Sequence, residues 1–348
     1  MTEPVLQVSD LEVSFATRRG RARVVNGVSW SVERGETLAI VGESGSGKSV
    51  SLMACMGLVP RPPATVSGSA LLDGQDLLAL PDEALRKVRG PGIAMVFQDP
   101  LTSLNPVLTV GRQVTEGMEV HLGLSPSAAE ERAVELLDTV GIPAPRARLG
   151  AYPHQLSGGM RQRVMIAMAL ACDPAVLVAD EATTALDVTI QAQIVELIAR
   201  LQSELGMAVV WITHDLGVVA GIADRVAVMY AGRIVESAPV DDLYASPRHP
   251  YTQGLLASLP VLGDRRATLA AIGGLPPDPV ALPAGCAFWP RCPVRGSERC
   301  ETSVPPLRPA DGSAPGHLVA SFYDARRDAF DAADPADAAD AADHGEAR

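Results

Sequence analysis

Short apolar runs, separated by glycine, proline and charged residues, follow one another through the first two-thirds of the chain. Residues 37–41, 93–97, 176–179 and 209–213 are almost wholly apolar, and their length predicts short buried strands. Residues 11–15 alternate between apolar and polar positions and predict a further strand. This succession indicates a core built around β-sheet.

Helical patterns lie between these strands, at residues 50–56, 127–140 and 164–171. Strand patterns prevail up to about residue 97, whereas residues 99–155 are richer in helical patterns. The strand–helix alternation then returns and runs to about residue 235, which is typical of an α/β core. We therefore predict an α/β fold with an inserted helical subdomain over about residues 99–155.

Size and composition limit the class of protein. With 348 residues, 47% hydrophobic content and a mean hydropathy of +0.16, the chain can build one sizeable core and a smaller appendage. Its apolar stretches all fall short of the ~20 residues that cross a bilayer. The first residues combine neither a basic region nor an apolar core, so we expect no secretory signal and a cytoplasmic chain.

The net charge of −12 speaks against a nucleic-acid partner, because phosphate backbones require basic surface. Part of the acidity lies in residues 324–348, where aspartates recur every third position from Asp328 to Asp343 among alanines, with Pro335 inside. Like charges at this spacing oppose a helix. We predict a disordered acidic tail over residues 324–348.

A glycine-rich segment directly behind the strand at residues 37–41 fits the pattern G-x-x-x-x-G-K-[ST]. Glycines allow backbone N–H groups to surround phosphate oxygens, the lysine neutralises the β- and γ-phosphates, and the final hydroxyl binds Mg²⁺. The motif therefore predicts an ATP or GTP site. Its residues are Gly42, Glu43, Ser44, Gly45, Ser46, Gly47, Lys48 and Ser49.

Two carboxylates close the strand at residues 176–179. Asp180 is placed to hold Mg²⁺ from the second side of the site. Glu181 can orient the water that attacks the γ-phosphate or accept its proton. This pair predicts nucleotide hydrolysis.

A third motif, Leu-Ser-Gly-Gly-Met at residues 156–160, precedes the helical pattern at 164–171. With this motif the chain resembles ATP-binding-cassette ATPases, whose signature reads LSGGQ. The resemblance extends to Gln98, to Ala-Leu-Asp at residues 185–187 and to His214, in the order in which the family carries them. A helix N-terminus that begins Ser-Gly-Gly presents free N–H groups to a γ-phosphate.

The resemblance implies a composite site closed by two cassettes that face head to tail. Phe15 would stack on adenine, Asp187 would lie at the seam, and Ser157, Gly158 and Gly159 would contact the ATP held by the partner. Mg²⁺ would be held by Ser49, Gln98 and Asp180. The residues that would bind and hydrolyse one ATP are Lys48, Ser49, Gln98, Asp180, Glu181 and His214.

Two positions depart from the family pattern. Met160 stands where many cassettes have glutamine, and Ala182 stands where proline is usual. Neither change removes a reacting group, and the loss of the proline costs under about 1 kcal/mol of loop rigidity. We still expect hydrolysis.

Beyond the cassette, residues 248–257, 273–277 and 285–293 resemble the C-terminal extension of oligopeptide/dipeptide/nickel uptake ATPases. The resemblance implies a subunit that powers peptide import at the cytoplasmic face of the membrane. Its partners would be a paralogous ATPase, two membrane subunits and an extracytoplasmic binding protein. We predict a cassette over residues 1–240 and the extension over residues 241–323.

The cysteines pose a separate question. Cys55 and Cys172 lie alone in apolar stretches and are interpreted as small buried hydrophobes, with disulfides unexpected in a reducing compartment. Many relatives carry four cysteines in the extension, a pattern that can hold an iron–sulfur cluster. Here Ser321 stands at the apparent fourth position, with His317 as another polar substitute. This leaves two alternatives for Cys286, Cys292 and Cys300, which are either cluster ligands or reduced structural thiols.

Three alternatives to peptide import remain. An importer of nickel or another small solute would carry the same motifs. A cassette ATPase acting on DNA would place a long coiled coil between the P-loop and the signature, and one acting on ribosomes would carry two cassettes; neither pattern is present. A non-catalytic regulatory cassette would not need Glu181 and His214.

Overall fold

The computed structural model describes most of the chain. Two parts of the sequence interpretation lie outside it, namely Ala185 and Leu186 before Asp187, and most of the acidic tail from residue 324 onwards. The described residues are 3–183, 187–259, 271–295, 297–313 and 315–325, together with the backbone of residues 329–330.

The main sheet has eight strands in the order β11-β12-β10-β9-β3-β8-β7-β6. Strands β9, β3, β8, β7 and β6 run parallel, and β10, β12 and β11 continue the sheet antiparallel. Parallel pairing brings the carboxyl ends of β3, β7 and β8 to one edge, where α/β proteins place their ligands. The bounds are β3 Thr37–Val41, β6 Ile93–Val96, β7 Val176–Asp180, β8 Ala208–Thr213, β9 Arg225–Tyr230, β10 Arg233–Pro239, β11 Arg308–Pro309 and β12 Leu318–Val319.

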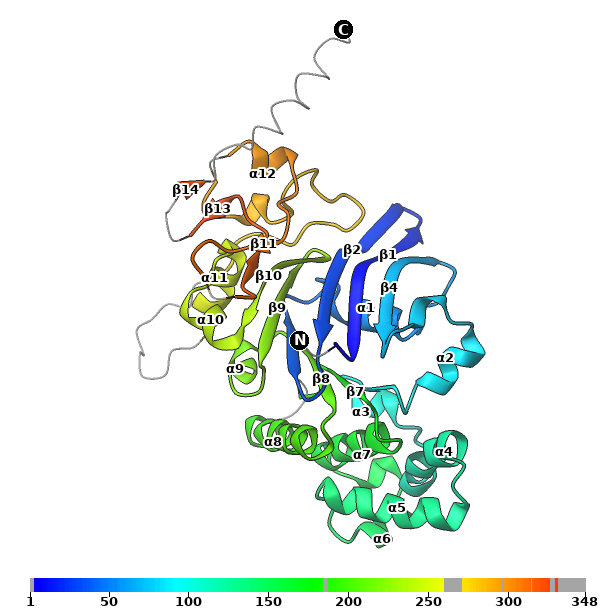
Figure 1. Cartoon of the computed structure of the whole chain (residues 1–348). Coiled ribbons are helices and arrows are strands. Elements are labelled where there is room, and N and C mark those ends of the chain that lie inside the picture. Colours follow the sequence, from blue (N-terminus) through cyan, green and yellow to red (C-terminus); the bar gives the residue numbers. More distant parts are fainter. Residues whose placement is uncertain are drawn as a thin grey trace.

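A second, antiparallel sheet has the order β2-β1-β4-β5 and packs over the first (Figure 1). Along β1 the buried residues Leu6, Val8, Leu11 and Val13 alternate with more exposed ones, because successive side chains of a strand point to opposite faces. Their buried face shares one core with β3 and helix α1. The bounds are β1 Leu6–Thr17, β2 Gly20–Val32, β4 Ala64–Leu72, β5 Gln75–Asp76 and α1 Lys48–Cys55.

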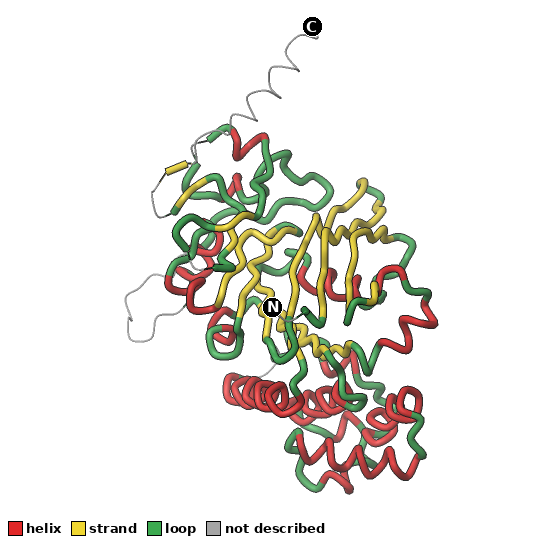
Figure 2. The backbone as a smooth tube through the Cα atoms, in the orientation of Figure 1, coloured by secondary structure: helices red, strands yellow, loops and turns green. Residues whose placement is uncertain are grey.

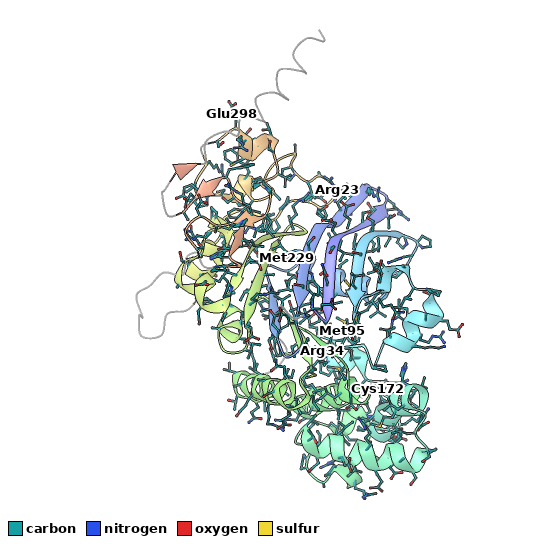
Figure 3. All side chains as sticks on the ribbon, in the orientation of Figure 1. Arg23, Arg34, Met95, Cys172, Met229 and Glu298 are labelled. Carbon is teal, nitrogen blue, oxygen red and sulfur yellow. The ribbon has the colours of Figure 1, made fainter. Side chains whose placement is uncertain are left out.

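Helices α3 to α8 gather at one end of the molecule, at the bottom of Figures 1 and 2. Side-chain oxygens of Thr109, Ser125, Ser157 and Asp187 cap the N-termini of α4, α5, α7 and α8, which satisfies free N–H groups there. A separate hydrophobic core, which includes the buried Cys172, holds these helices together (Figure 3). The bounds are α2 Asp82–Val88, α3 Pro100–Ser103, α4 Val110–Leu122, α5 Pro126–Thr139, α6 Pro145–Arg148, α7 Gly158–Leu170, α8 Val188–Leu205 and α9 Leu216–Val219, with short 3₁₀ turns at Leu77–Ala79 and Pro153–Gln155.

The C-terminal part consists mostly of loops that pack against β9 and β10 (Figure 2). It is joined to the main sheet through β12, which pairs Val319 with Glu236 of β10. Beside that pair, the fully buried carboxylate of Glu236 lies 2.7 Å from Nε2 of His317. The bounds are α10 Val240–Ala245, α11 Pro250–Ala257, α12 Arg299–Thr302, β13 Tyr323–Asp324, β14 Ala329–Phe330 and a 3₁₀ turn at Trp289–Arg291.

Two helices begin earlier than the apolar pattern predicts. Helix α1 begins at Lys48 rather than at residue 50, and α7 begins at Gly158 rather than at residue 164. In both, the first turn carries residues of a motif, Lys48 and Ser49 in α1 and Gly158 and Gly159 in α7, which do not contribute to an apolar period. Among the described residues, no helix is long and apolar enough to cross a membrane.

Candidate nucleotide site

The loop between β3 and α1 has a backbone that only glycine can form at two positions. Gly42 has φ +154°, and a Cβ there would lie 2.1 Å from the carbonyl oxygen of Met229. Gly47 has φ +103°, and a Cβ there would lie 2.6 Å from the carbonyl oxygen of Val24. Glycine at these two positions allows the tight loop that joins β3 to α1. The loop ends at the N-terminus of α1, where free N–H groups favour an anion.

Two buried polar groups in this loop fit a phosphate ligand. The hydroxyl oxygen of Ser46 is buried and has no hydrogen-bond partner among the described residues. Lys48 is only 5% exposed, and its Nζ donates to the carbonyl oxygens of Gly42 (2.7 Å) and Glu43 (3.0 Å). Burial lowers the pKa of Lys48, although the carboxylates of Glu181, Asp180 and Glu43 oppose that shift. The Lys48 ammonium can exchange these carbonyl oxygens for phosphate oxygens when a nucleotide binds.

Ser49 and Asp180 meet across the site. The Ser49 hydroxyl donates to Oδ1 of Asp180 at 2.7 Å. Burial raises the pKa of Asp180, and the hydrogen bond from Ser49 acts in the opposite direction. A hydroxyl and a carboxylate beside a phosphate-binding loop are the oxygen ligands that Mg²⁺ takes in nucleotide sites, so these residues fit the metal.

Two side chains from the ends of neighbouring strands contact the carboxylate of Glu181. Gln98 Nε2 donates to Oε2 of Glu181 at 2.7 Å, and His214 Nδ1 lies 3.2 Å from Oε1. The Glu181 backbone has φ +47°, and its N–H donates to the carbonyl oxygen of Ile212 at 2.9 Å. A left-handed conformation in a residue other than glycine stores strain, and such residues cluster at functional sites. Gln98, Glu181 and His214, which follow β6, β7 and β8, are thus brought together as one group.

Phe15 lies in β1, opposite Ala22 and Ala64 of the flanking strands. It is half-buried and packs partly against the core between the two sheets. Its stacking on adenine stays a prediction.

The signature segment lies apart from the loop at residues 42–49, at the start of α7 in the helical region (Figure 1). Ser157 Oγ accepts a hydrogen bond from the backbone N–H of Met160 at 3.3 Å and caps the helix. Ser157 and Gly158 are exposed, and a Cβ at Gly158 would meet no described atom within 4 Å. Gly159 is closer to its surroundings, because a Cβ there would lie 3.0 Å from Ile190.

The three cysteines of the C-terminal part line one small apolar cavity together with Ser321. However, the described residues contain no group of three or more His, Cys, Asp and Glu side chains placed to hold a metal ion. Burial raises the pKa of all three thiols, to about 11 for Cys300. His317 is engaged with Glu236 and is 1% exposed, so it does not serve as a substitute ligand. The structure therefore gives no support to an iron–sulfur cluster on Cys286, Cys292 and Cys300.

Cys55 and Cys172 are buried single thiols, as predicted, and all five cysteines are free. Burial raises the pKa of Cys55 to about 12, so this thiol stays protonated and unreactive.

One contact of the candidate site was missed from the sequence. Arg291, in the 3₁₀ turn of the C-terminal part, forms an ion pair with Glu43 of the glycine-rich loop at 2.6 Å. The only sequence signal was its place inside the Trp-Pro-Arg-Cys segment at residues 289–292, which says nothing about what the side chain contacts.

Comparisons with known proteins agree with this geometry. A family model described as ABC transporter matches residues 25–184, and one described as the C-terminal region of the oligopeptide/dipeptide transporter matches residues 235–300. The oligopeptide transport ATP-binding protein of Bacillus subtilis is 55% identical over 286 residues, which cover 82% of this chain and 80% of that protein. The dipeptide transport ATP-binding protein of the same organism is 53% identical over 294 residues, which cover 84% and 88%. A dimeric ATP-binding cassette solved in a post-hydrolysis state, bound to ADP and Pi, is similar with a TM-score of 0.61 and 29% identity, over 68% of this chain and 98% of that one.

Proposed function

The chain belongs to the family of ABC transporter ATPases, and from this premise we propose that it hydrolyses ATP to power the import of di- or oligopeptides. The observation that carries the proposal is the combination of the Gln98–Glu181–His214 group with an extension of the oligopeptide/dipeptide type. The first supports hydrolysis. The second supports peptides as the solute.

In this proposal the loop at residues 42–49 holds the phosphates of ATP, and Lys48 neutralises their charge. Ser49, Asp180 and Gln98 would hold Mg²⁺, which when bound supplies positive charge that stabilises the transferring phosphoryl group. Glu181 orients the attacking water and accepts its proton. Gln98 and His214 hold the two carboxylate oxygens of Glu181 in place. Phe15 stacks on the adenine ring.

We propose that Ser157, Gly158 and Gly159 contact the ATP of a second cassette. Gly158 supports this assignment, because no described atom of its own chain lies near enough to require glycine and its φ is not positive. The close approach of a phosphate bound to a second cassette would require glycine at this position. Asp187, which caps α8 at the neighbouring surface, would lie at the same seam.

The relatives imply membrane permease partners within an ABC transporter. More specifically, we propose a paralogous ATPase as the second cassette, two permease subunits, and an extracytoplasmic binding protein that delivers the solute. The chain would then lie at the cytoplasmic face of the cell membrane. We assign residues 1–240 to the cassette, 241–323 to the extension and 324–348 to an acidic tail. For Cys286, Cys292 and Cys300 we propose reduced structural thiols, with the iron–sulfur cluster as the alternative.

Reconstitution tests the solute. The chain would be assembled with its membrane subunits and second ATPase in vesicles, and ATP hydrolysis measured as the binding protein is loaded with peptides or with nickel. We expect stimulation by peptides and none in the matched complex that carries Glu181→Gln. Stimulation by nickel alone would replace the peptide proposal by the alternative importer.

A further inference from the structure

Glu43, the second residue of the glycine-rich loop, is held by a side chain from the opposite end of the sequence. Arg291 Nη1 donates to Oε2 of Glu43 at 2.6 Å, and Nη2 donates to Oε1 at 2.8 Å. The pair is bidentate, which gives both strength and a fixed orientation. The Arg291 side chain is 4% exposed and that of Glu43 is 29% exposed, so solvent screens the pair only in part.

Arg291 is itself fixed within the extension. Its Nε donates to the carbonyl oxygen of Gly273 at 2.9 Å, and Nη2 also donates to the carbonyl oxygen of Ile272 at 3.3 Å. Nη1 donates to the hydroxyl of Tyr230 at 3.3 Å, and the guanidinium carbon lies 5.7 Å from the centre of that ring. The hydrogen bonds to Glu43 raise the pKa of Arg291 further above its ordinary range. A guanidinium with this many partners cannot turn away without losing several of them.

Tyr251 holds Glu43 by a second route. Its hydroxyl accepts a hydrogen bond from the backbone N–H of Glu43 at 2.9 Å. Tyr251 lies on α11 and is fully buried, with its ring centre 4.6 Å from that of Tyr230 and 5.4 Å from that of Phe288. The aromatic rings therefore form a rigid support behind the loop.

A contact of the Glu43 backbone connects the aromatic rings and Arg291 to Lys48 of the glycine-rich loop. The carbonyl oxygen of Glu43 accepts from Lys48 Nζ, so the N–H, the carbonyl and the carboxylate of Glu43 each have a partner. The N–H and the carboxylate are bonded to the extension, whereas the carbonyl accepts from the lysine proposed to neutralise the phosphates and from the backbone N–H of Ser46. Any displacement of Glu43 would move one of the two carbonyl oxygens that hold Lys48, the other being that of Gly42.

We propose that Arg291 and Tyr251 are positioning residues for ATP binding, through which the extension pre-organises the glycine-rich loop. A loop fixed in its binding conformation loses less entropy when the ligand arrives, and so binds more tightly. The inference concerns ATP binding by this chain and does not depend on which solute is transported.

The competing explanation is that the pair merely attaches the extension to the cassette. In that case breaking it would lower thermal stability and leave the affinity of the folded protein for ATP unchanged. The extension also contacts the cassette elsewhere, since Arg23 donates its backbone N–H to Pro279 at 2.8 Å and Arg19 pairs with Asp278 at 2.5 Å. Arg23 lies on β2, and neither it nor Arg19 contacts Arg291 or Glu43 through these bonds (Figure 3). These contacts keep the extension attached when Arg291 is changed.

The test measures equilibrium binding of Mg²⁺-ATP to the full-length chain, together with thermal unfolding without nucleotide. Arg291→Ala should weaken ATP binding by about fivefold or more, as expected for coupling between two sites. Arg291→Lys keeps the charge and loses the bidentate geometry, so its effect should be intermediate. The matched control is Arg299→Ala, which removes a guanidinium 4.3 Å from the ring of Phe322 in the same extension. Arg299 neighbours Glu298 at the outer end of the extension (Figure 3), and its loss should leave ATP affinity unchanged.

A double-mutant cycle with Glu43→Gln isolates the pair. If Arg291 acts through Glu43, the fold-loss of ATP affinity in the double variant should be smaller than the product of the fold-losses in the two single variants. Wild-type ATP affinity in folded Arg291→Ala, or strictly multiplicative losses in the cycle, would overturn the proposal. Should Arg291→Ala fail to fold, Arg291→Lys in the same cycle decides between these outcomes. Neither result would bear on peptides as the solute.

Discussion

Gln98 donates a hydrogen bond to Glu181 across 2.7 Å, although the two residues are 83 positions apart. Gln98 follows β6 at the entry to the helical region, and Glu181 follows β7 at the candidate site. A movement of the helical region relative to the sheet would therefore reach the carboxylate proposed to activate water.

The first prediction concerns Glu181 itself. Glu181→Gln keeps the shape of the side chain and removes its basicity, so ATP should still bind while turnover falls by roughly 100-fold or more. The measurement is steady-state ATP hydrolysis by the assembled transporter. Glu204→Gln on α8, which loses only a half-exposed ion pair with Arg200, is the control. Wild-type turnover in Glu181→Gln would remove Glu181 from the proposed mechanism.

The second prediction concerns the signature glycine. Because a Cβ at Gly158 meets no described atom within 4 Å, Gly158→Val should leave the thermal stability of the isolated chain almost unchanged. Hydrolysis by the assembled pair of cassettes should fall sharply, since the added methyl groups would occupy the space of the partner's phosphate. Gly150→Ala is a matched control, because its surroundings are equally open. Full activity of the Gly158→Val complex would argue against a site shared between cassettes.

The third prediction is a pH dependence in the extension. Burial lowers the pKa of His249 from 6.5 to about 4, and its Nδ1 accepts a hydrogen bond from the backbone N–H of Tyr251 at 3.0 Å. The buried titratable groups beside it are Glu236, which accepts a hydrogen bond from the backbone N–H of His249, and His317, which contacts the other carboxylate oxygen of Glu236. A depressed pKa in the folded state means that this contribution to stability is present above about pH 6.5 and is lost as the pH falls toward about 4.

His249→Asn should therefore flatten the fall in thermal stability between these pH values, because an asparagine oxygen can still cap α11 and does not titrate. The control is His154→Asn, which changes an exposed imidazole stacked on Tyr152. An unchanged pH profile in His249→Asn would show that another group governs acid stability. Thermal unfolding across the pH range provides the measurement.

The fourth prediction concerns the cysteines. Anaerobically purified protein should lack the broad visible absorbance, iron and sulfide of a cluster, because the described thiols are not grouped as metal ligands and Ser321 replaces a fourth. Ser321→Cys supplies the missing thiolate and should increase iron occupancy if the cavity can open around a cluster. Four irons and four sulfides in the unmodified protein would establish the cluster and direct attention to Ser321 or water as the fourth ligand.

The candidate nucleotide site could be predicted from the sequence because each part of it is a local feature. A phosphate-binding loop needs glycines at fixed positions within eight residues, and Asp180 and Glu181 directly follow an apolar strand. Parallel strands present their carboxyl ends at one edge, so the meeting of Glu181 with Gln98 and His214 follows from the strand patterns once the sheet forms. The apolar pattern predicts the starts of α1 and α7 less well, since motif residues that do not follow the apolar period occupy their first turns.

Contacts between distant segments were decided by the tertiary structure alone. The guanidinium of Arg291 reaches Glu43 across 248 positions, and His317 reaches Glu236 across 81, yet neither pair has a local pattern that links its members. The three cysteines are close in sequence, but the directions of their side chains depend on how an irregular loop packs, and hydrophobic periodicity carries no information about loops. Motifs determine which chemistry the chain can perform, because their residues act over a few peptide units. Packing determines which other residues hold that chemistry in place, because it depends on the whole core at once.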